Sequence, residues 1–172
     1  MRNLILGSSG QIGEALCKYY GEKNVERFDI TDSDLHDLRL NDNKILLEKM
    51  QSCDFVYFLA FDVGGSRYLQ KYQRTFEFID NNMRLMQNTF DALRTTKKPF
   101  VFASSQMSNM DYSSYGTLKR VGEWYTEILG GLVVKFWNVY GIEHDLEKSH
   151  VITDFILKAK DTGVIDMLTD GA

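Results

Sequence analysis

The sequence predicts a doubly wound α/β fold of the Rossmann type, built on a parallel β-sheet. Two observations predict it. Short apolar runs that end near Gly, Ser or Asp alternate with stretches whose apolar residues recur at helical spacing. The first run is followed by three glycines that open the first helical stretch. Because strands alternate with helices, the units are βαβ, and such units form a parallel sheet covered on both faces.

Each element is recognised from its own pattern. The expected strands are short apolar runs, the last of which leaves into a loop: residues 3–7, 24–30, 54–61, 99–105 and 132–141. The expected helices have apolar residues three or four positions apart: residues 11–21, the end of a polar segment at 32–50, 75–93, 113–129 and 150–163. Residues 164–172 are expected to begin a further strand. In the longest helix, one apolar face is expected: Phe76, Ile79, Met83, Met86 and Phe90.

Composition limits the classes of protein that fit. The 172 residues are 44% hydrophobic and 26% charged, as expected for one soluble globular domain. A net charge of −4, without a basic run, argues against a nucleic-acid partner. No apolar stretch approaches the roughly 18 residues of a membrane span. Cys17 and Cys53 form neither a metal-binding spacing nor a disulfide framework, so we expect no metal and a cytoplasmic location.

A glycine-rich turn follows the first strand. In GSSGQIG the glycines are Gly7, Gly10 and Gly13, with the spacing G-x-x-G-x-x-G. Glycines at such a turn allow the tight bend, the approach of a pyrophosphate to the backbone, and close helix–strand packing. The helix N-terminus then offers free N–H groups to the phosphates. We therefore expect this turn to bind a dinucleotide through Gly7, Ser9, Gly10, Gln11, Ile12 and Gly13.

Asp29 ends the second predicted strand, sixteen residues after Gly13. A carboxylate at this place can accept hydrogen bonds from both adenosine ribose hydroxyls, and it repels a 2′-phosphate. No Arg or Lys follows closely to bind such a phosphate, so NAD is the expected cofactor. A solvated loop aspartate is the alternative interpretation.

Further segments resemble, in order, the extended short-chain dehydrogenase/reductases of the nucleotide-sugar epimerase/dehydratase family. CDFVYFLAF is similar to D-x-V-x-H-L-A-A, and NMRLMQNTFDAL to N-V-x-G-T-x-N-L-L-E-A. FVFASSQMS resembles the strand that carries the catalytic Ser or Thr, and FWNVYG resembles the segment that leads to the substrate region. The resemblance implies that DLHDL contacts adenine through Asp37 and Leu38, and that Leu59 and Ala60 lie beside the cofactor.

The resemblance also implies a catalytic set of Ser105, Tyr115 and Lys119. Tyr115 and Lys119 are four residues apart in a helical stretch, which puts them on one helix face. A nearby ammonium stabilises phenolate and lowers a tyrosine pKa that is ordinarily about 10. Tyr115 is therefore expected to act as an acid/base near neutral pH, and Lys119 to hold cofactor ribose hydroxyls as well. A second pair of equal spacing, Tyr19 and Lys23, lies far from the strand ends and carries no such implication.

Two positions after the serine narrow the reaction. Dehydratases of the family carry Asp and Glu there, whereas this chain has Gln106 and Met107. A thioether cannot abstract a proton, so dehydration is disfavoured. The residues implied to contact substrate are Gly64, Gly65, Gln106 and Asn138. His144 and His150 are acid/base candidates by their chemistry alone, with surface loop histidines the alternative.

The favoured function is an NAD-dependent nucleotide-sugar epimerase that acts through a transient keto-sugar. A keto-sugar reductase, a sugar dehydratase of the same family and a non-catalytic dinucleotide-binding sensor are the alternatives. Residues 1–142 are expected to form the NAD-binding domain, and residues 143–172 only the start of a truncated nucleotide-sugar lobe. The family pairs its subunits through two helices, which implies a homodimer whose candidate contacts are Met83, Met86, Phe90, Trp124 and Tyr125.

Overall fold

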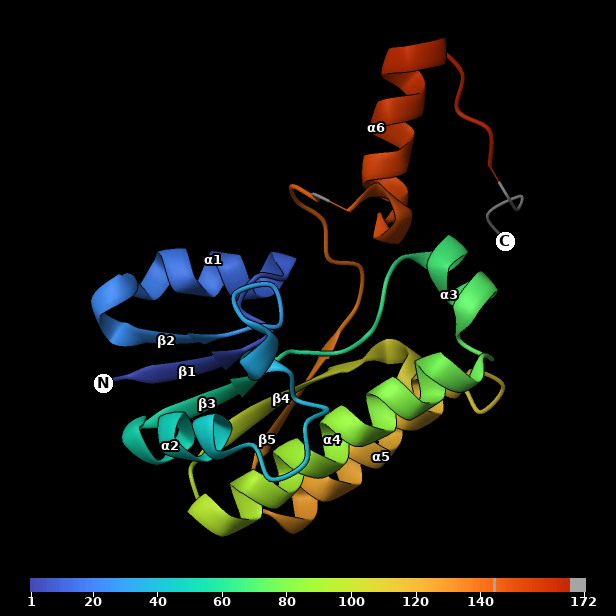
Figure 1. The fold of residues 1–172 in the computed structure, drawn as a ribbon. Coiled ribbons are helices and arrows are strands. Elements are labelled where there is room, and N and C mark those ends of the chain that lie inside the picture. Colours follow the sequence, from blue (N-terminus) through green and yellow to red (C-terminus); the bar gives the residue numbers. More distant parts are fainter. Residues whose placement is uncertain (144, 168–172) are drawn as a thin grey trace.

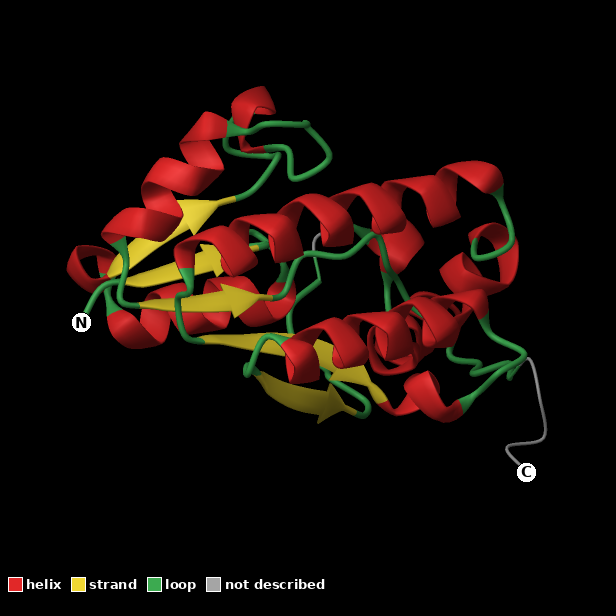
Figure 2. Ribbon diagram, turned by 90° about the horizontal axis from the view of Figure 1, so that it is seen from below, coloured by secondary structure: helices red, strands yellow, loops and turns green. Residues whose placement is uncertain are grey.

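The structure is a computed structural model that describes residues 1–143 and 145–167 (Figure 1). Five parallel strands form one sheet in the order β2-β1-β3-β4-β5, and they all point the same way in Figure 2. The strands are β1 (Asn3–Leu6), β2 (Val25–Phe28), β3 (Phe55–Phe58), β4 (Phe100–Ser105) and β5 (Leu132–Phe136). The expected parallel α/β fold is confirmed.

Helices cover the sheet on both faces. Helix α1 lies on one face, whereas α2, α4 and α5 lie on the other (Figure 1). The helices are α1 (Gln11–Tyr20), α2 (Lys44–Ser52), α3 (Ser66–Tyr72), α4 (Phe76–Thr96), α5 (Ser114–Ile128) and α6 (Val151–Thr162). Short 3-10 turns are η1 (Glu22–Asn24), η2 (Asp34–His36), η3 (Gln106–Asn109) and η4 (Leu146–Lys148).

The strand order reverses beside β1, and this reversal places the site. The chain passes from β1 to β2 on one side, then returns across β1 to β3. Leu6 pairs with both Phe28 and Phe58, so these three strands end level with one another. Ligands of open α/β sheets bind outside the carboxyl ends of the strands at such a reversal. The glycine turn leaves β1 at this point.

Polar caps set the start of the two long helices. The Thr75 hydroxyl accepts a hydrogen bond from Phe78 N at 3.3 Å, and the Ser113 hydroxyl accepts one from Gly116 N at 3.1 Å. Each cap satisfies an N–H group that the helix leaves free. Ser113 therefore fixes where α5 begins, and it places Tyr115 in the first turn of the helix.

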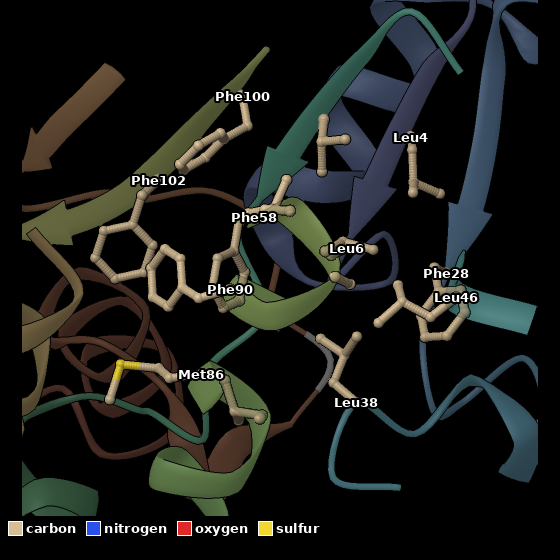
Figure 3. Packing of buried hydrophobic residues seen from close by; sticks show 14 of the residues in the cluster. Leu4, Leu6, Phe28, Leu38, Leu46, Phe58, Met86, Phe90, Phe100 and Phe102 are labelled. Carbon is tan, nitrogen blue, oxygen red and sulfur yellow. The ribbon is translucent and has the colours of Figure 1, made fainter. Parts of the chain in front are cut away.

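The main core lies between the sheet and the α2–α4–α5 layer, and Figure 3 shows its labelled side chains from the strands, α2 and α4 packed together. Its centre is aromatic: the Phe58 ring centroid lies 5.2 Å from that of Phe102 and 5.3 Å from that of Phe90. Burying each such side chain stabilises the fold by roughly 1.5–3 kcal/mol. A Cβ atom on Gly122 would lie 2.4 Å from the Phe102 ring, so this glycine lets α5 pack closely on β4.

Several sequence expectations need correction. Helix α3 was not expected. Residues 164–167 form no strand, and residues 168–172 of the expected strand lie outside the described residues. The apolar face assigned to α4 was partly wrong, because Phe76, Ile79 and Met83 are exposed while Met86 and Phe90 are buried. Burial also removes Met86 and Phe90 as candidate dimer contacts. Among the described helices, none is long and apolar enough to cross a membrane.

Candidate functional site

A cavity of about 1120 Å³ runs along the carboxyl ends of the strands, from the glycine turn to α5. Every residue that the sequence assigned to cofactor or substrate lines it. These residues are Gly7, Ser9, Gly10, Gln11, Ile12, Gly13, Asp29, Asp37, Leu38, Leu59, Ala60, Gly64, Gly65, Ser105, Gln106, Tyr115, Lys119 and Asn138. The fold thus brings together residues that are up to 131 positions apart in the chain, from Gly7 to Asn138.

The three glycines of the turn differ in what surrounds them. Gly7 has φ +87°, and a Cβ atom there would lie 2.7 Å from Ala60 N. A Cβ atom on Gly13 would lie 2.1 Å from the Gly7 carbonyl oxygen. Beside Gly10, by contrast, the nearest atom to such a Cβ would be the same oxygen at 3.4 Å. Gly7 and Gly13 therefore allow main-chain packing, while Gly10 leaves space at the cavity.

The start of α1 has the properties of an anion site. Its N-cap, Gly10, supplies no side chain to the free N–H groups of the first turn. The buried Gln11 Nε2 has no hydrogen-bond partner among the described residues. Free N–H groups and the helix dipole favour a negatively charged ligand at this end. These residues fit the pyrophosphate of a dinucleotide.

Asp29 directly follows β2 and is fixed by main-chain donors. Its Oδ2 atom accepts a hydrogen bond from Ser9 N at 3.0 Å, and Oδ1 accepts from Thr31 N at 3.1 Å. The carboxylate therefore lies between the glycine turn and the end of β2. A negative charge beside this turn is suited to hydroxyl groups and unsuited to a further phosphate.

Asp37 and Leu38 line the far end of the cavity, together with an arginine that sequence reasoning missed. Arg39 Nε lies 2.9 Å from Asp37 Oδ1, and Arg39 Nη2 lies 2.8 Å from Asp37 Oδ2. Arg39 Nη1 also donates to Asn81 Oδ1 at 2.9 Å. Burial raises the pKa of Asp37, but the bonds from Arg39 outweigh it and hold that pKa below its usual value. The only sequence signal was an Arg two residues after an Asp.

Ser105 is the last residue of β4, and it lies beside Tyr115 in the first turn of α5. The Ser105 hydroxyl accepts a hydrogen bond from Met107 N at 3.2 Å and so begins η3. A Cβ atom on Gly116 would lie 2.1 Å from the Met107 carbonyl oxygen, so this glycine lets α5 approach the turn. Burial raises the pKa of Tyr115, and a hydrogen bond with the Ser105 hydroxyl lowers it in part.

Lys119 lies one helical turn after Tyr115 and is almost wholly buried. Its Nζ atom donates to the Ala103 carbonyl oxygen at 2.7 Å, and it lies 3.7 Å from the centroid of the Phe61 ring. Burial lowers the pKa of Lys119 to about 7. The expected fall in the Tyr115 pKa is not found, because burial of the phenol dominates and the ammonium is directed at Ala103.

Gly64 and Gly65 lie beside another part of the chain. Cβ atoms at these positions would lie 3.0 Å from Lys148 Cα and 2.0 Å from Ser149 O, respectively. Gly65 N donates to Lys148 O at 2.9 Å, and Lys148 Nζ lies 3.2 Å from Asp62 Oδ1. The two glycines thus admit the segment before α6, an approach that the sequence did not indicate. Their predicted contact with a sugar stays a prediction.

Glu143 and His150 form a pair on the same cavity. His150 N donates to Glu143 Oε2 at 3.0 Å, and His150 Nδ1 contacts Glu143 Oε1. Burial raises the pKa of Glu143, but hydrogen bonds from His150 and Thr153 outweigh it and lower that pKa. His150 is therefore a carboxylate-paired imidazole at the cavity, whereas His144 lies outside the described residues. Sequence reasoning did not identify Glu143.

Solved structures with the same fold are similar to this chain at low sequence identity. Pen from Bacillus thuringiensis has TM-score 0.69 and 22% identity, over 96% of this chain and 58% of that one. A GDP-6-OMe-4-keto-L-xylo-heptose reductase from Campylobacter jejuni has TM-score 0.71 and 18% identity, over 91% and 52%. A dTDP-4-dehydrorhamnose reductase from Bacillus anthracis, in complex with NADP, has TM-score 0.68 and 17% identity, over 92% and 60%.

This chain therefore spans about three fifths or less of the length of these three proteins. A search of curated proteins found no match. The sequence model of one family matches residues 3–172, which is nearly the whole chain. The chain belongs to the NAD dependent epimerase/dehydratase family.

Proposed function

We propose that this chain is an NAD-dependent nucleotide-sugar epimerase that acts through a transient keto-sugar. One observation carries the proposal: Ser105, Tyr115 and Lys119 line the cavity that begins at the glycine turn. A hydroxyl, a phenol and an amine on the wall of a dinucleotide-sized cavity suit oxidation and reduction at a single carbinol carbon. The family match supports this class of chemistry.

Each side chain would have a distinct task. The Ser105 hydroxyl would donate a hydrogen bond to the sugar oxygen and hold it near Tyr115. Tyr115 would take the proton from this oxygen as the carbinol is oxidised and return it as the ketone is reduced. Lys119 would bind the cofactor ribose hydroxyls and, once oriented towards the phenol, favour its ionised form. When bound, the nicotinamide would accept and return the hydride.

Different parts of the cavity would bind different parts of the cofactor and the substrate. The glycine turn and the start of α1 would hold the pyrophosphate, and Asp29 would accept from the adenosine ribose, which favours NAD over NADP. Asp37 and Leu38 would contact adenine, and Leu59 and Ala60 would lie against the cofactor. At the other end, Gly64, Gly65, Gln106 and Asn138 would face the sugar nucleotide.

A keto-sugar reductase is the second candidate. It would use the same three residues, but hydride would leave the cofactor without returning. The names of two similar structures, a heptose reductase and a dehydrorhamnose reductase, favour it. Glu143 and His150 add a second acid/base group on the cavity, which either reaction could use. Gln106 and Met107 continue to argue against a dehydratase.

The nucleotide sugar and a second copy of the chain are the proposed partners. The exposed apolar side chains of α4 and α5 include Met83, Trp124 and Tyr125, which support a homodimer through these two helices. A non-catalytic sensor remains the candidate from another class. It would need a cofactor site but would have no use for Ser105 and Tyr115.

Calorimetric titration with NAD⁺ and NADP⁺ tests the cofactor site first. The expected result is stronger binding of NAD⁺, weakened by Lys119→Ala and nearly unchanged in Tyr115→Phe. Incubation with UDP-, dTDP- and GDP-sugars and their keto forms then separates the reactions. An epimerase changes the sugar without net change in nicotinamide absorbance, whereas a reductase consumes one reduced nicotinamide for each ketone. Binding without turnover of any sugar favours the sensor, and failure to bind either dinucleotide contradicts the proposal.

A further inference from the structure

The Lys119 ammonium is enclosed by one carbonyl group and three aromatic rings. Its hydrogen bond goes to Ala103 O at 2.7 Å, and the residue is 3% exposed. The centroids of the Phe61, Phe102 and Tyr115 rings lie 3.7, 5.0 and 5.9 Å from Nζ. A ligand in the cavity can therefore reach Nζ only if one of these neighbours moves.

Three of the four neighbours are fixed by the fold. Ala103 belongs to β4 and is paired with Val134 of β5. Phe102 is fully buried in the main core, where its ring packs against Phe58. Tyr115 is 8% exposed in the first turn of α5. Moving any of them would disturb the sheet, the core or the helix.

Phe61 is held differently. It lies in the loop between β3 and α3, is only partly buried, and lines the cavity. Its ring meets the Tyr115 ring edge-on, with centroids 5.7 Å apart. The Phe61 ring lines the cavity and lies against the Lys119 ammonium. Of the four neighbours, Phe61 is the one that can turn without opening the core.

We propose that Phe61 is a gate over Lys119, whose ring must turn aside before hydroxyl groups in the cavity can bind the ammonium. The cofactor role of Lys119 in this inference rests on the proposed function, but the gate itself does not. Turning the ring exchanges a cation–π contact for hydrogen bonds that Nζ donates to the ligand. The ligand that fits this exchange is a ribose or sugar diol, which offers adjacent oxygen acceptors to one ammonium.

Closing the gate also keeps water from the amine. Burial lowers the pKa of Lys119 to about 7, with no charged group contributing to the shift. The groups in contact with Nζ are the Ala103 carbonyl and the rings of Phe61, Phe102 and Tyr115, of which only Tyr115 titrates. Removing the Phe61 ring should therefore expose Lys119 and return its pKa towards 10.5.

The test is the rate at which Lys119 reacts with acetic anhydride, followed by mass spectrometry across a range of pH without any nucleotide. The plateau rate at high pH reports access to Nζ, and the midpoint reports its pKa. Because the Phe61 ring covers an amine on a residue that is only 3% exposed, Phe61→Ala should raise the plateau rate several-fold. By admitting water to the amine, the same change should move the midpoint upwards.

Two further variants keep the test decisive. Phe61→Leu keeps an apolar side chain of similar length without the ring, and it replaces Phe61→Ala if circular dichroism shows that the latter unfolds. Phe55→Ala is the matched control, because Phe55 is a half-buried aromatic of β3 whose ring packs on Tyr57. An unchanged plateau in the folded Phe61 variants, or an equal rise in Phe55→Ala, overturns the gate. Since no cofactor is present, this failure is distinct from failure to bind NAD⁺.

Discussion

Lys119 Nζ donates a hydrogen bond to the Ala103 carbonyl oxygen at 2.7 Å, which joins α5 to β4 in the middle of the candidate site. Ala103 lies two residues before Ser105, and Lys119 lies four residues after Tyr115. One bond between helix and strand thus holds the elements that carry all three candidate catalytic residues. Because the ammonium is buried, the same bond ties the stability of this region to pH.

The first prediction concerns Lys119→Met. The Lys119 pKa is about 7 in the folded chain and returns to about 10.5 on unfolding. Between these values the unfolded chain binds more protons, so the free energy of unfolding rises with pH by up to about 1.4 kcal/mol per unit. Below the interval the lysine is charged in both states and destabilises the fold, and above it the penalty is gone. The variant should lack this rise, as urea unfolding at several pH values will show.

Subtracting the variant's free energy of unfolding from that of the wild type, at each pH, removes the contributions of the other titrating groups. Lys98→Met is a suitable control, since Lys98 is half-buried and donates to the Cys53 carbonyl oxygen at 2.8 Å. A difference between wild type and Lys119→Met that does not change between about pH 7 and pH 10.5 would contradict the prediction.

The second prediction separates two glycines of the same turn. Gly13→Ala would place its Cβ atom 2.1 Å from the Gly7 carbonyl oxygen, so it should destabilise the fold by about 1–3 kcal/mol. Gly10→Ala meets that oxygen only at 3.4 Å and should lower stability by less than about 1 kcal/mol. Its methyl group should nevertheless block the pyrophosphate, so NAD⁺ binding should be lost in calorimetry. Undiminished binding by Gly10→Ala would move the phosphate site away from this turn.

The third prediction uses Asp29→Asn. The amide keeps the shape of the side chain and can still accept from Ser9 N, but it lacks the charge. Losing a charged acceptor should weaken NAD⁺ binding about tenfold and reduce the preference for NAD⁺ over NADP⁺. Asp32→Asn is the control, because Asp32 is a neighbouring carboxylate that pairs with Arg27 at 4.0 Å. Equal effects of the two variants would show that general charge near β2, rather than Asp29, sets the preference.

Much of the fold could be predicted because its signals are local. Apolar runs, glycine stops and the caps at Thr75 and Ser113 all act within a few residues. Helix α3 lacked such a signal: its N-cap, Gly65, offers no side-chain cap, and the segment is held by the Gly65–Lys148 bond from far along the chain. On α4, the apolar residues form two faces, one buried and one exposed. Spacing alone cannot tell which of the two faces meets the sheet.

The candidate site, too, could be predicted only where its signals are local or follow from the topology. Parallel topology brings strand ends together, so the glycine turn, Asp29 and Ser105 could be placed on one cavity from the sequence. Arg39, Phe61 and Glu143 were missed, because their roles depend on long-range contacts. The pKa of Tyr115 was expected to fall, but burial raises it. Helical spacing could not show that the Lys119 ammonium is directed at Ala103 rather than at the phenol.

The last prediction tests the proposed homodimer. Met83 of α4 and Trp124 of α5 are 46% and 55% exposed, on helices that lie side by side in Figure 1. If this surface pairs two copies, Met83→Glu with Trp124→Glu buries unpaired carboxylates and should raise the dimer dissociation constant at least about 30-fold. Light scattering after gel filtration measures this, and Tyr19→Glu on α1, 81% exposed on the opposite face, should leave assembly unchanged. A wild-type chain that is monomeric at every concentration, or a double variant that still dimerises, would rule out this interface.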